Sequence, residues 1–220
     1  MSVLVEAAVE SLADALAACD GGADRLELCA DLRAGGTTPA ESLIEQVIDR
    51  VTVPVMVMIR PRGGSFVYTA HELSSMRRDI EMARALEADG VVFGVLDGRN
   101  EIDAYRCRDL MDIADGMPVT FHRAFDRVHD RVYALEALIE LGVDRVLTSG
   151  GAETAERGID ELRDLVDAAD GQLTILAGGG VRDQNVGEIV RECGVTEVHL
   201  RCESDAERIR RVKNVLEFED

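Results

Sequence analysis

The segment VPVMVMIR at residues 53–60 is followed by HELSSMRRDIEMARALEADG at 71–90 and then by VVFGVL at 91–96. The first and third pieces are short apolar runs rich in β-branched residues, which is typical of strands buried on both faces. The middle piece has apolar residues three and four positions apart, which predicts an amphipathic helix. Two strands joined through a helix lie parallel in one sheet, so this succession decides the fold class.

The same unit repeats along the chain, and residues 41–51 (ESLIEQVIDRV) predict another of the helices. We therefore expect an α/β protein, a single (β/α)8 TIM barrel over residues 1–220. An open doubly wound sheet uses the same alternation, but no GxGxxG motif follows the first strand. The predicted strands are VLVEA at 3–7, RLELC at 25–29, VPVMVMIR at 53–60, VVFGVL at 91–96, PVTFHRAF at 118–125, RVLTS at 145–149, LTILAGG at 173–179 and EVHLR at 197–201.

The chain is strongly acidic, with a formal net charge of −19, and Lys213 is its only lysine. An acidic, lysine-poor surface suits a protein that stays hydrated where salt screens its self-repulsion. We expect a halophilic cytoplasm, with an acidic protein of an ordinary cytoplasm as the alternative. Nucleic acid is excluded as a partner, since phosphate binding needs a basic surface.

The five cysteines are odd in number and show no CxxC spacing, which excludes a disulfide framework and a structural zinc pattern. The first residues, MSVLVEAAVESLADA, lack the basic and apolar regions of a signal peptide. No apolar run approaches the roughly 20 residues that span a bilayer. We expect a soluble, cytoplasmic protein without a membrane partner.

Polar residues gather at the carboxyl ends of the predicted strands, where barrel enzymes carry their active sites. Residues two apart on a strand share a face, so Met56 and Met58 accompany Arg60, and Thr120 accompanies His122. A single Glu–Arg pair at a barrel mouth is often structural, and methionines are most simply barrel filling. Ionisable groups at five strand ends together favour a functional site. The candidates at these ends are Glu6, Glu27, Cys29, Arg60, Arg62, His122, Arg123, Asp126, Thr148, Ser149, His199 and Arg201.

The segment ILAGGGVR at 175–182 is the clearest single motif. Gly178, Gly179 and Gly180 let the backbone approach an anion closely, and a helix starting near 181–182 would present unpaired N–H groups to it. After the seventh strand of a barrel this is the usual phosphate position. A tight turn that merely needs glycine is the simpler explanation of the same residues.

Five motifs occur in order: GADRLELCADLRAGGTTP, IRPRGGSFVY, VTFHRAFDR, VLTSGG and LAGGGVR. Together they resemble the CutC family of copper homeostasis proteins, and the matches run from about residue 3 to 199. The resemblance implies a (β/α)8 barrel and a role in copper handling, for which Cu(I)-binding cysteines have been proposed.

Two departures from the family pattern bear on that role. The family's Glu-Val-Cys on the first strand corresponds here to Glu6-Ala7-Ala8, whereas Glu-Leu-Cys on the second is intact as Glu27-Leu28-Cys29. Cu(I) prefers soft sulfur ligands, so Cys29 needs Met56, Met58 or Cys202 as its partner. After the eighth strand the family's His-Ser-Ser is replaced by His199-Leu200-Arg201, where Arg201 can supply the charge of a phosphate cup.

Two functions follow as hypotheses. The first is a cytoplasmic protein that binds or distributes Cu(I), with Cys29 as the metal ligand. The second is a cofactor-independent enzyme acting on a small anionic or phosphorylated metabolite, with a homodimer as a plausible assembly. In the second, tuned carboxyl and imidazole groups move protons, arginines hold anionic groups bidentately, and Asp126 either orients His122 or pairs with an arginine. The catalytic candidates are Glu6, Glu27, Arg60, His122 and Asp126, and the ligand-binding candidates are Arg62, Arg123, Ser149, Gly178, Gly179, Gly180, His199 and Arg201.

Overall fold

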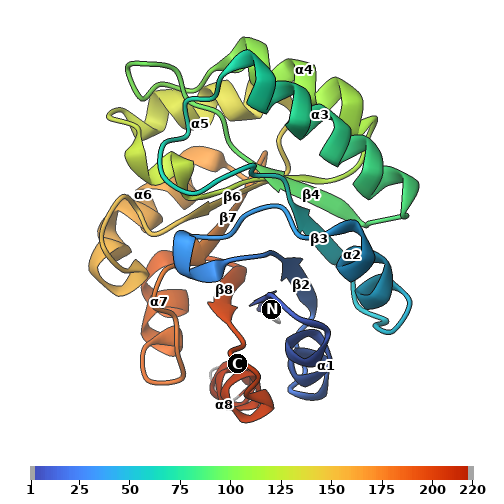
Figure 1. The fold of residues 1–220 in the computed structure, drawn as a ribbon. Helices are drawn as coiled ribbons and strands as arrows, with labels where there is room; N and C mark the ends of the chain where they lie inside the picture. The colour runs from blue at the N-terminus through green and yellow to red at the C-terminus, as the bar shows by residue number, and fades with distance from the viewer. Residues whose placement is uncertain (1–2, 218–220) are drawn as a thin grey trace.

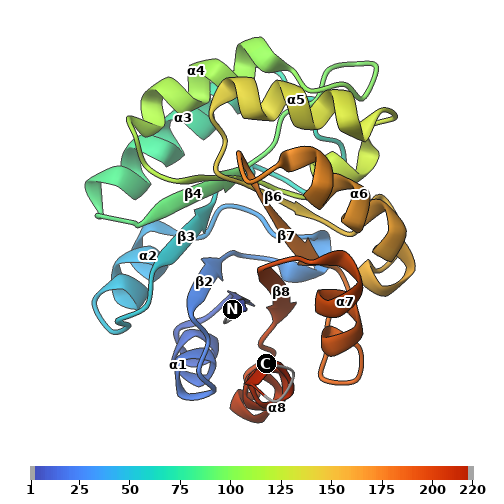
Figure 2. The same cartoon turned by 180° about the vertical axis from the view of Figure 1, so that it is seen from behind.

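Eight parallel strands close into a barrel that the helices surround. The computed structural model describes residues 3–217. Each strand pairs in parallel with the next, and β8 pairs with β1. Figures 1 and 2 show the helices on the outside of the barrel from opposite sides. The predicted (β/α)8 barrel is confirmed, and the open doubly wound sheet is wrong because the last strand closes on the first.

The strands are β1 (Leu4–Val9), β2 (Arg25–Leu28), β3 (Val55–Met58), β4 (Gly90–Phe93), β5 (Val119–Phe121), β6 (Arg145–Thr148), β7 (Thr174–Gly178) and β8 (Glu197–Arg201). The helices are α1 (Leu12–Asp20), α2 (Glu41–Ile48), α3 (Ala70–Ala85), α4 (Ala104–Ala114), α5 (Arg131–Leu141), α6 (Ile159–Ala169), α7 (Val186–Cys193) and α8 (Ala206–Glu217). Three 3-10 helices lie between them: η1 (Leu32–Ala34), η2 (Arg123–Arg127) and η3 (Ala155–Gly158).

Several strands are shorter than the sequence pattern predicts. The stretch 53–60 contributes only Val55–Met58, and the stretch 118–125 contributes only Val119–Phe121. Pro54 and Pro118 precede these strands, and proline has no N–H to donate to a ladder. At the other end the chain leaves the sheet, so that Arg60 and His122 follow their strands and stand at the barrel mouth.

The amino end of the barrel is fixed by a repeated device. Asp24, Asp89 and Asp144 each come directly before a strand. Each carboxylate accepts a hydrogen bond of 2.8 Å from a backbone N–H of the preceding strand. These hydrogen bonds satisfy donors at strand starts that would otherwise be unpaired. The strands are thereby held in register at the end opposite to the polar candidates.

Apolar packing divides into two regions. The larger core lies between strands and helices and includes Phe93, Phe121 and Phe125, each fully buried. A separate cluster of Cys29, Met56, Met58 and Val92 fills part of the barrel interior. No helix within residues 3–217 is long and apolar enough to cross a membrane.

Candidate functional site

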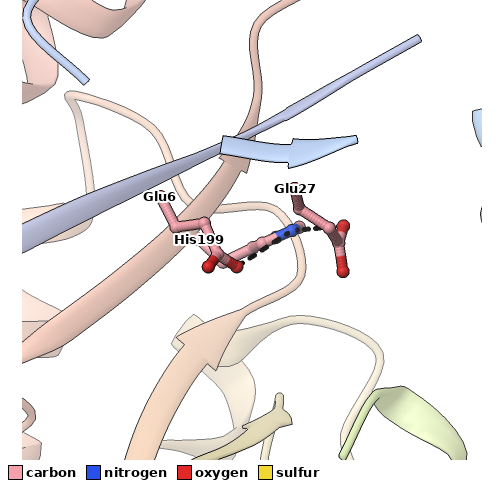
Figure 3. Close-up of side chains that lie close together, drawn as sticks. All are labelled: Glu6, Glu27 and His199. Carbon is pink, nitrogen blue, oxygen red and sulfur yellow. Dashed lines mark hydrogen bonds and ion pairs between the residues drawn. The ribbon is translucent and has the colours of Figure 1, made fainter. Parts of the chain in front are cut away.

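Glu6, Glu27 and His199 meet inside the barrel from three neighbouring strands. Glu6 stands in register with His199 across β1 and β8, and Ala8 stands in register with Glu27 across β1 and β2. The Nε2 atom of His199 lies 2.9 Å from Oε2 of Glu27 and 3.9 Å from Oε1 of Glu6. Figure 3 shows the two carboxylates on either side of the imidazole. Both carboxylates are buried.

The charges of this group are set by burial and by one another. Burial opposes ionisation of Glu27, but the neighbouring His199 outweighs it and lowers the pKa of Glu27. Burial also opposes a charged His199, yet Glu27 and Glu6 raise the pKa of its imidazole. For Glu6 burial prevails over Arg25 and His199, so the pKa of that carboxyl is raised. The carboxylate of Glu27 and the protonated form of His199 therefore stabilise each other at the wall of the cavity.

Below this group lies a set of charges that the sequence reasoning missed. Arg25, almost completely buried, donates to Glu6 and to Glu197, and Arg145 lies 3.2 Å from the same Glu197 carboxylate. The sequence did contain a signal for them: Arg25 lies two residues before Glu27, and Glu197 lies two residues before His199. Residues two apart on a strand point to the same face, so both could have been expected inside the barrel. The charged part of the barrel interior is thus deeper than the strand ends alone indicate.

His122 follows β5 and turns its ring into the mouth. Burial, and after it the charge of Arg60, lower the pKa of His122 to about 3, so the ring is neutral at physiological pH. Its Nδ1 accepts the amide N–H of Ala124 at 3.3 Å, so we assign the ring proton to Nε2. That Nε2 is buried and has no hydrogen-bond partner among the residues that the structure describes.

The end of β4 makes room for His122. A Cβ atom built on Gly94 would lie 2.5 Å from Nδ1 of His122, which is closer than real Cβ atoms come. The Phe66 ring packs against the other side of the imidazole, with ring centroids 4.9 Å apart. Gly94 is a second residue that the sequence reasoning missed, since a lone glycine after a strand carries no distinguishing signal.

Arg60 is a buried cation bound to backbone carbonyls. Its Nη1 donates to the carbonyls of residues 34–36, its Nη2 donates to Gly64, and its guanidinium lies 4.7 Å from the Phe66 ring centroid. Only 4% of Arg60 is exposed, and no carboxylate of residues 3–217 lies within ion-pair distance. The side chain fixes two loops at the mouth, and its charge has no ion-pair partner among the described residues.

A polar wall closes the opposite side of the mouth. Asp126 accepts from the Thr148 hydroxyl at 2.6 Å and from the backbone N–H groups of Ser149 and Gly151 at 3.1 Å. It also accepts from Nε of Arg123 at 2.6 Å, while Nη2 of Arg123 donates to the Ser149 hydroxyl at 2.7 Å. Of the two predicted roles for Asp126, the structure shows pairing with an arginine, and Asp126 makes no hydrogen bond to His122 within residues 3–217.

The glycines after β7 adopt the expected special conformations, but the helix after them begins later than predicted. Gly179 and Gly180 have φ values of +101° and +75°, and a Cβ on Gly179 would lie 3.2 Å from Nη1 of Arg123. The helix expected near 181–182 starts at Val186, so that part of the prediction is wrong. The physical reason is a turn in which the Asn185 side chain accepts the Arg182 N–H and donates to the Gly180 carbonyl.

These side chains enclose a cavity of about 1080 Å³ at the carboxyl ends of the strands. Its wall includes five arginines and only three acidic residues, in a chain of net charge −19. Of the candidates, the cavity wall contains Glu27, Arg60, His122, Arg123, Asp126, Gly179, Gly180, His199 and Arg201. The remaining candidates outside this wall are Glu6, Cys29, Arg62, Thr148, Ser149 and Gly178.

Arg62 and Arg201 differ in what they do at the rim. Arg62 bonds Glu72 and the carbonyls of Ser65 and Val67, so it holds its own loop rather than facing the cavity. Arg201 belongs to the wall and donates to the Leu32 carbonyl at 2.5 Å. Gly178 lies at the base of the wall, where a Cβ would meet Leu147 at 2.5 Å.

The sulfur-bearing side chains lie beside the charged group. Cys29, Met56 and Met58 pack together, whereas Cys202 belongs to the core outside the strands. The Cys29 thiol lies 3.6 Å from Oε2 of Glu27. Burial, followed by the charge of Glu27, raises the pKa of that thiol well above its usual range.

Residues 3–204 match the model of the CutC family. The chain belongs to the CutC family. A relative in Homo sapiens, named copper homeostasis protein cutC homolog, is 44% identical over 211 residues, which cover 96% of this chain and 77% of the human one. A family protein CutC of Bacteroides thetaiotaomicron is 46% identical over 210 residues, covering 95% of this chain and 84% of that protein.

Solved structures agree with the family. The crystal structure of CutC from Streptococcus agalactiae matches with a TM-score of 0.86 at 37% identity, covering 90% of this chain and 97% of that one. Thiamine phosphate pyrophosphorylase from Pyrococcus furiosus matches with a TM-score of 0.68 at 15% identity, over 99% of this chain and 96% of that one, and shows the fold alone. The predicted family is confirmed.

Proposed function

We propose that this CutC-family protein is an enzyme whose barrel mouth binds a small anionic metabolite and stabilises negative charge on it. The observation that carries the proposal is Arg60, a buried guanidinium in the cavity wall with no carboxylate partner among residues 3–217. A buried charge is costly unless it is paired. An anionic group of a ligand would supply the missing charge.

The charge of the whole wall supports an anionic ligand. The surface of so acidic a chain repels anions, yet arginines outnumber acidic residues around the cavity. Wall residues of one sign concentrate the field inside a cleft and attract a ligand of the opposite sign. Arg123 and the backbone at Gly179 and Gly180 offer a second anion position across the mouth from Arg60.

His122 would supply the chemistry. His122 lines the cavity, and its neutral ring keeps a buried Nε2–H donor without a partner among the described residues. A preorganised donor of this kind stabilises charge that develops on a ligand oxygen in the transition state. Oε1 of Glu27 belongs to the same wall and is also without a hydrogen-bond partner among the described residues, so a substrate bound between Glu27 and His122 would meet a proton acceptor and a donor.

Inorganic phosphate at constant ionic strength is a direct probe of the anion site. Phosphate should raise the melting temperature of the wild type and of Arg84→Gln, whose arginine pairs with Asp115 on the outer helices. In Arg123→Gln the rise should fall to less than about half, because a charged hydrogen-bonding group is lost. Equal rises in all three proteins would contradict an anion site at the mouth.

Catalysis is tested with a small-molecule extract followed by mass spectrometry. The wild type should deplete an anionic metabolite and produce a matched product, and folded His122→Asn should do so at least about a hundredfold more slowly, the usual cost of losing one such donor. Arg84→Gln is the matched control. An extract in which no anionic metabolite changes, or in which His122→Asn works as well as the wild type, would overturn the enzyme proposal.

Copper handling is the second candidate, with Cu(I) as cargo rather than cofactor. It is favoured by the packing of Cys29 with Met56 and Met58, three soft donors in one cluster, and by the copper homeostasis name of the human relative. The raised pKa of the Cys29 thiol and the alanine at position 8 weigh against it, because Cu(I) prefers a deprotonated thiolate.

A Cu(I) titration against a chromophoric chelator separates the two candidates. Copper handling predicts one tightly bound Cu(I) per chain, lost in Cys29→Ser and retained in Cys19→Ser, where the cysteine is partly exposed in α1. If the wild type competes no better than Cys29→Ser, this chain does not handle copper through Cys29.

A further inference from the structure

Three potential ligand atoms converge at the floor of the cavity. One atom each from Glu6, Glu27 and His199 lies within 4.8 Å of the others. Ligands of a Zn²⁺ ion stand about 2.0–2.2 Å from the metal, so neighbouring ligand atoms are separated by roughly 3–4 Å. The present spacing is slightly wider than that of a closed metal site. A small movement of two glutamate side chains would bring it into range.

The carboxylates carry an independent sign of an absent ligand. Oε1 of Glu6 and Oε1 of Glu27 are both buried, and neither has a hydrogen-bond partner among residues 3–217. Buried polar atoms are nearly always satisfied, and each unsatisfied one costs free energy. Glu6 is completely buried and Glu27 nearly so, so bulk water does not offset this cost. The two carboxylates that carry these oxygens lie on either side of the same imidazole (Figure 3).

The charges around the site also leave room for a cation. The charged group holds three carboxyl groups, Glu6, Glu27 and Glu197, but only two arginines, Arg25 and Arg145, so one carboxylate is left for a metal ion that binds the neutral form of His199. The hydrogen bond between His199 and Glu27 occupies the position between the ligand atoms. A metal ion would take that position instead.

We propose that Glu6, Glu27 and His199 bind one divalent transition-metal ion of the Zn²⁺ or Mn²⁺ class at the floor of the mouth. Two carboxylates and one imidazole are harder ligands than Cu(I) selects, and they suit such ions. Arg25 orients Glu6 from below, as outer-shell partners orient metal ligands. Glu27 and His199 also line the cavity, so the remaining coordination positions open towards the ligand.

The test uses the full chain, stripped of metal with a chelator, and Co²⁺ or Zn²⁺ alone as probes. The wild type should bind one equivalent, and Co²⁺ should give d–d absorption without a thiolate charge-transfer band. Affinity should fall at least about tenfold in Glu27→Gln and in His199→Gln, because losing a ligand costs no less than losing an outer-shell partner. Cys29→Ser should bind as the wild type does.

Glu197→Gln is the matched control, since Glu197 belongs to the same buried charges without being one of the three ligands. Binding within a few-fold of the wild type is expected there. The proposal is overturned by no stoichiometric binding, by equal binding in the ligand variants, by a thiolate band, or by an equal loss in Glu197→Gln. Should a ligand variant not fold, the stoichiometry and the Co²⁺ spectrum of the wild type decide alone.

This inference is separable from the proposed enzyme function. The phosphate experiment is run on chelator-treated protein and reports on Arg123, whereas the metal experiment contains no phosphate and reports on Glu27 and His199. Either result can fail while the other stands.

Discussion

The interior of this barrel has two unlike halves. On the side of β8, β1 and β2 it is filled by ionisable groups that pair with one another, among them Glu6, Arg25 and Glu197. On the side of β2, β3 and β4 it is filled by Cys29, Met56, Met58 and Val92. Strand β2 serves both, since Glu27 and Cys29 lie two residues apart. In the charged half, directional hydrogen bonds between charged groups fix the side-chain positions. The soft half fills volume with flexible apolar side chains and tolerates substitution.

The largest expected effect is in the charged half, from Arg25→Met. Removing Arg25 takes the arginine partner from buried Glu6 and leaves Glu197 with Arg145 alone, and breaking a buried ion pair in this way costs about 3–5 kcal/mol. Denaturant unfolding should show that loss of stability. The matched change Arg84→Met, in an exposed pair with Asp115, should cost less than about 1 kcal/mol. Equal costs for the two variants would show that the charged half is not special.

A truncation in the soft half should cost less. Met58→Ala removes buried apolar atoms, and we expect about 2 kcal/mol, the low end for such changes, because Met58 borders the cavity and water can refill the space. The same unfolding experiment measures it. A cost above that of Arg25→Met would invert the comparison between the halves.

A volume-conserving substitution in the soft half should reduce the stability still less. Met56→Leu keeps the volume and the apolar character at a position only 2% exposed, so a loss below about 1.5 kcal/mol is expected. Unfolding by urea, with circular dichroism as the readout, provides the number. A loss of several kcal/mol would mean that the methionine thioether itself is required there.

The smallest effect is expected from chemical labelling of the cysteines, which should not change the stability of the protein. Cys19 is partly exposed and the other four cysteines are buried, and burial raises the pKa of Cys107 to about 12. A thiol reagent should therefore modify about one cysteine quickly in the native protein and all five after unfolding. The native reaction should disappear in Cys19→Ser. Rapid labelling of Cys29 would show that the soft half opens to solvent.

The sequence predicts the architecture well because periodicity and motif order both depend on burial, which the residues report directly. It also predicts that Glu27, His122, Arg123 and His199 stand at one end of the barrel, since strand ends converge there. It does not predict how they pair. From the sequence, Asp126 could equally well bond His122 or an arginine. In the structure the hydrogen bonds from the turn at 148–151 hold its carboxylate beside Arg123.

Other features lie beyond any local pattern. Arg25 and Glu197 are 172 residues apart, and nothing in either strand alone says that they are partners. The late start of α7 depends on one asparagine side chain bonding the backbone on both sides of the turn. Such long-range and side-chain-to-backbone hydrogen bonds are properties of the folded chain.

At Gly94 the absence of a side chain shapes the candidate site. The imidazole of His122 occupies the volume that any side chain at position 94 would need. A substitution of Gly94 by alanine would therefore displace the imidazole of His122, which follows β5. For anyone redesigning this mouth, residue 94 is a control point for the direction of His122 that leaves His122 itself unaltered.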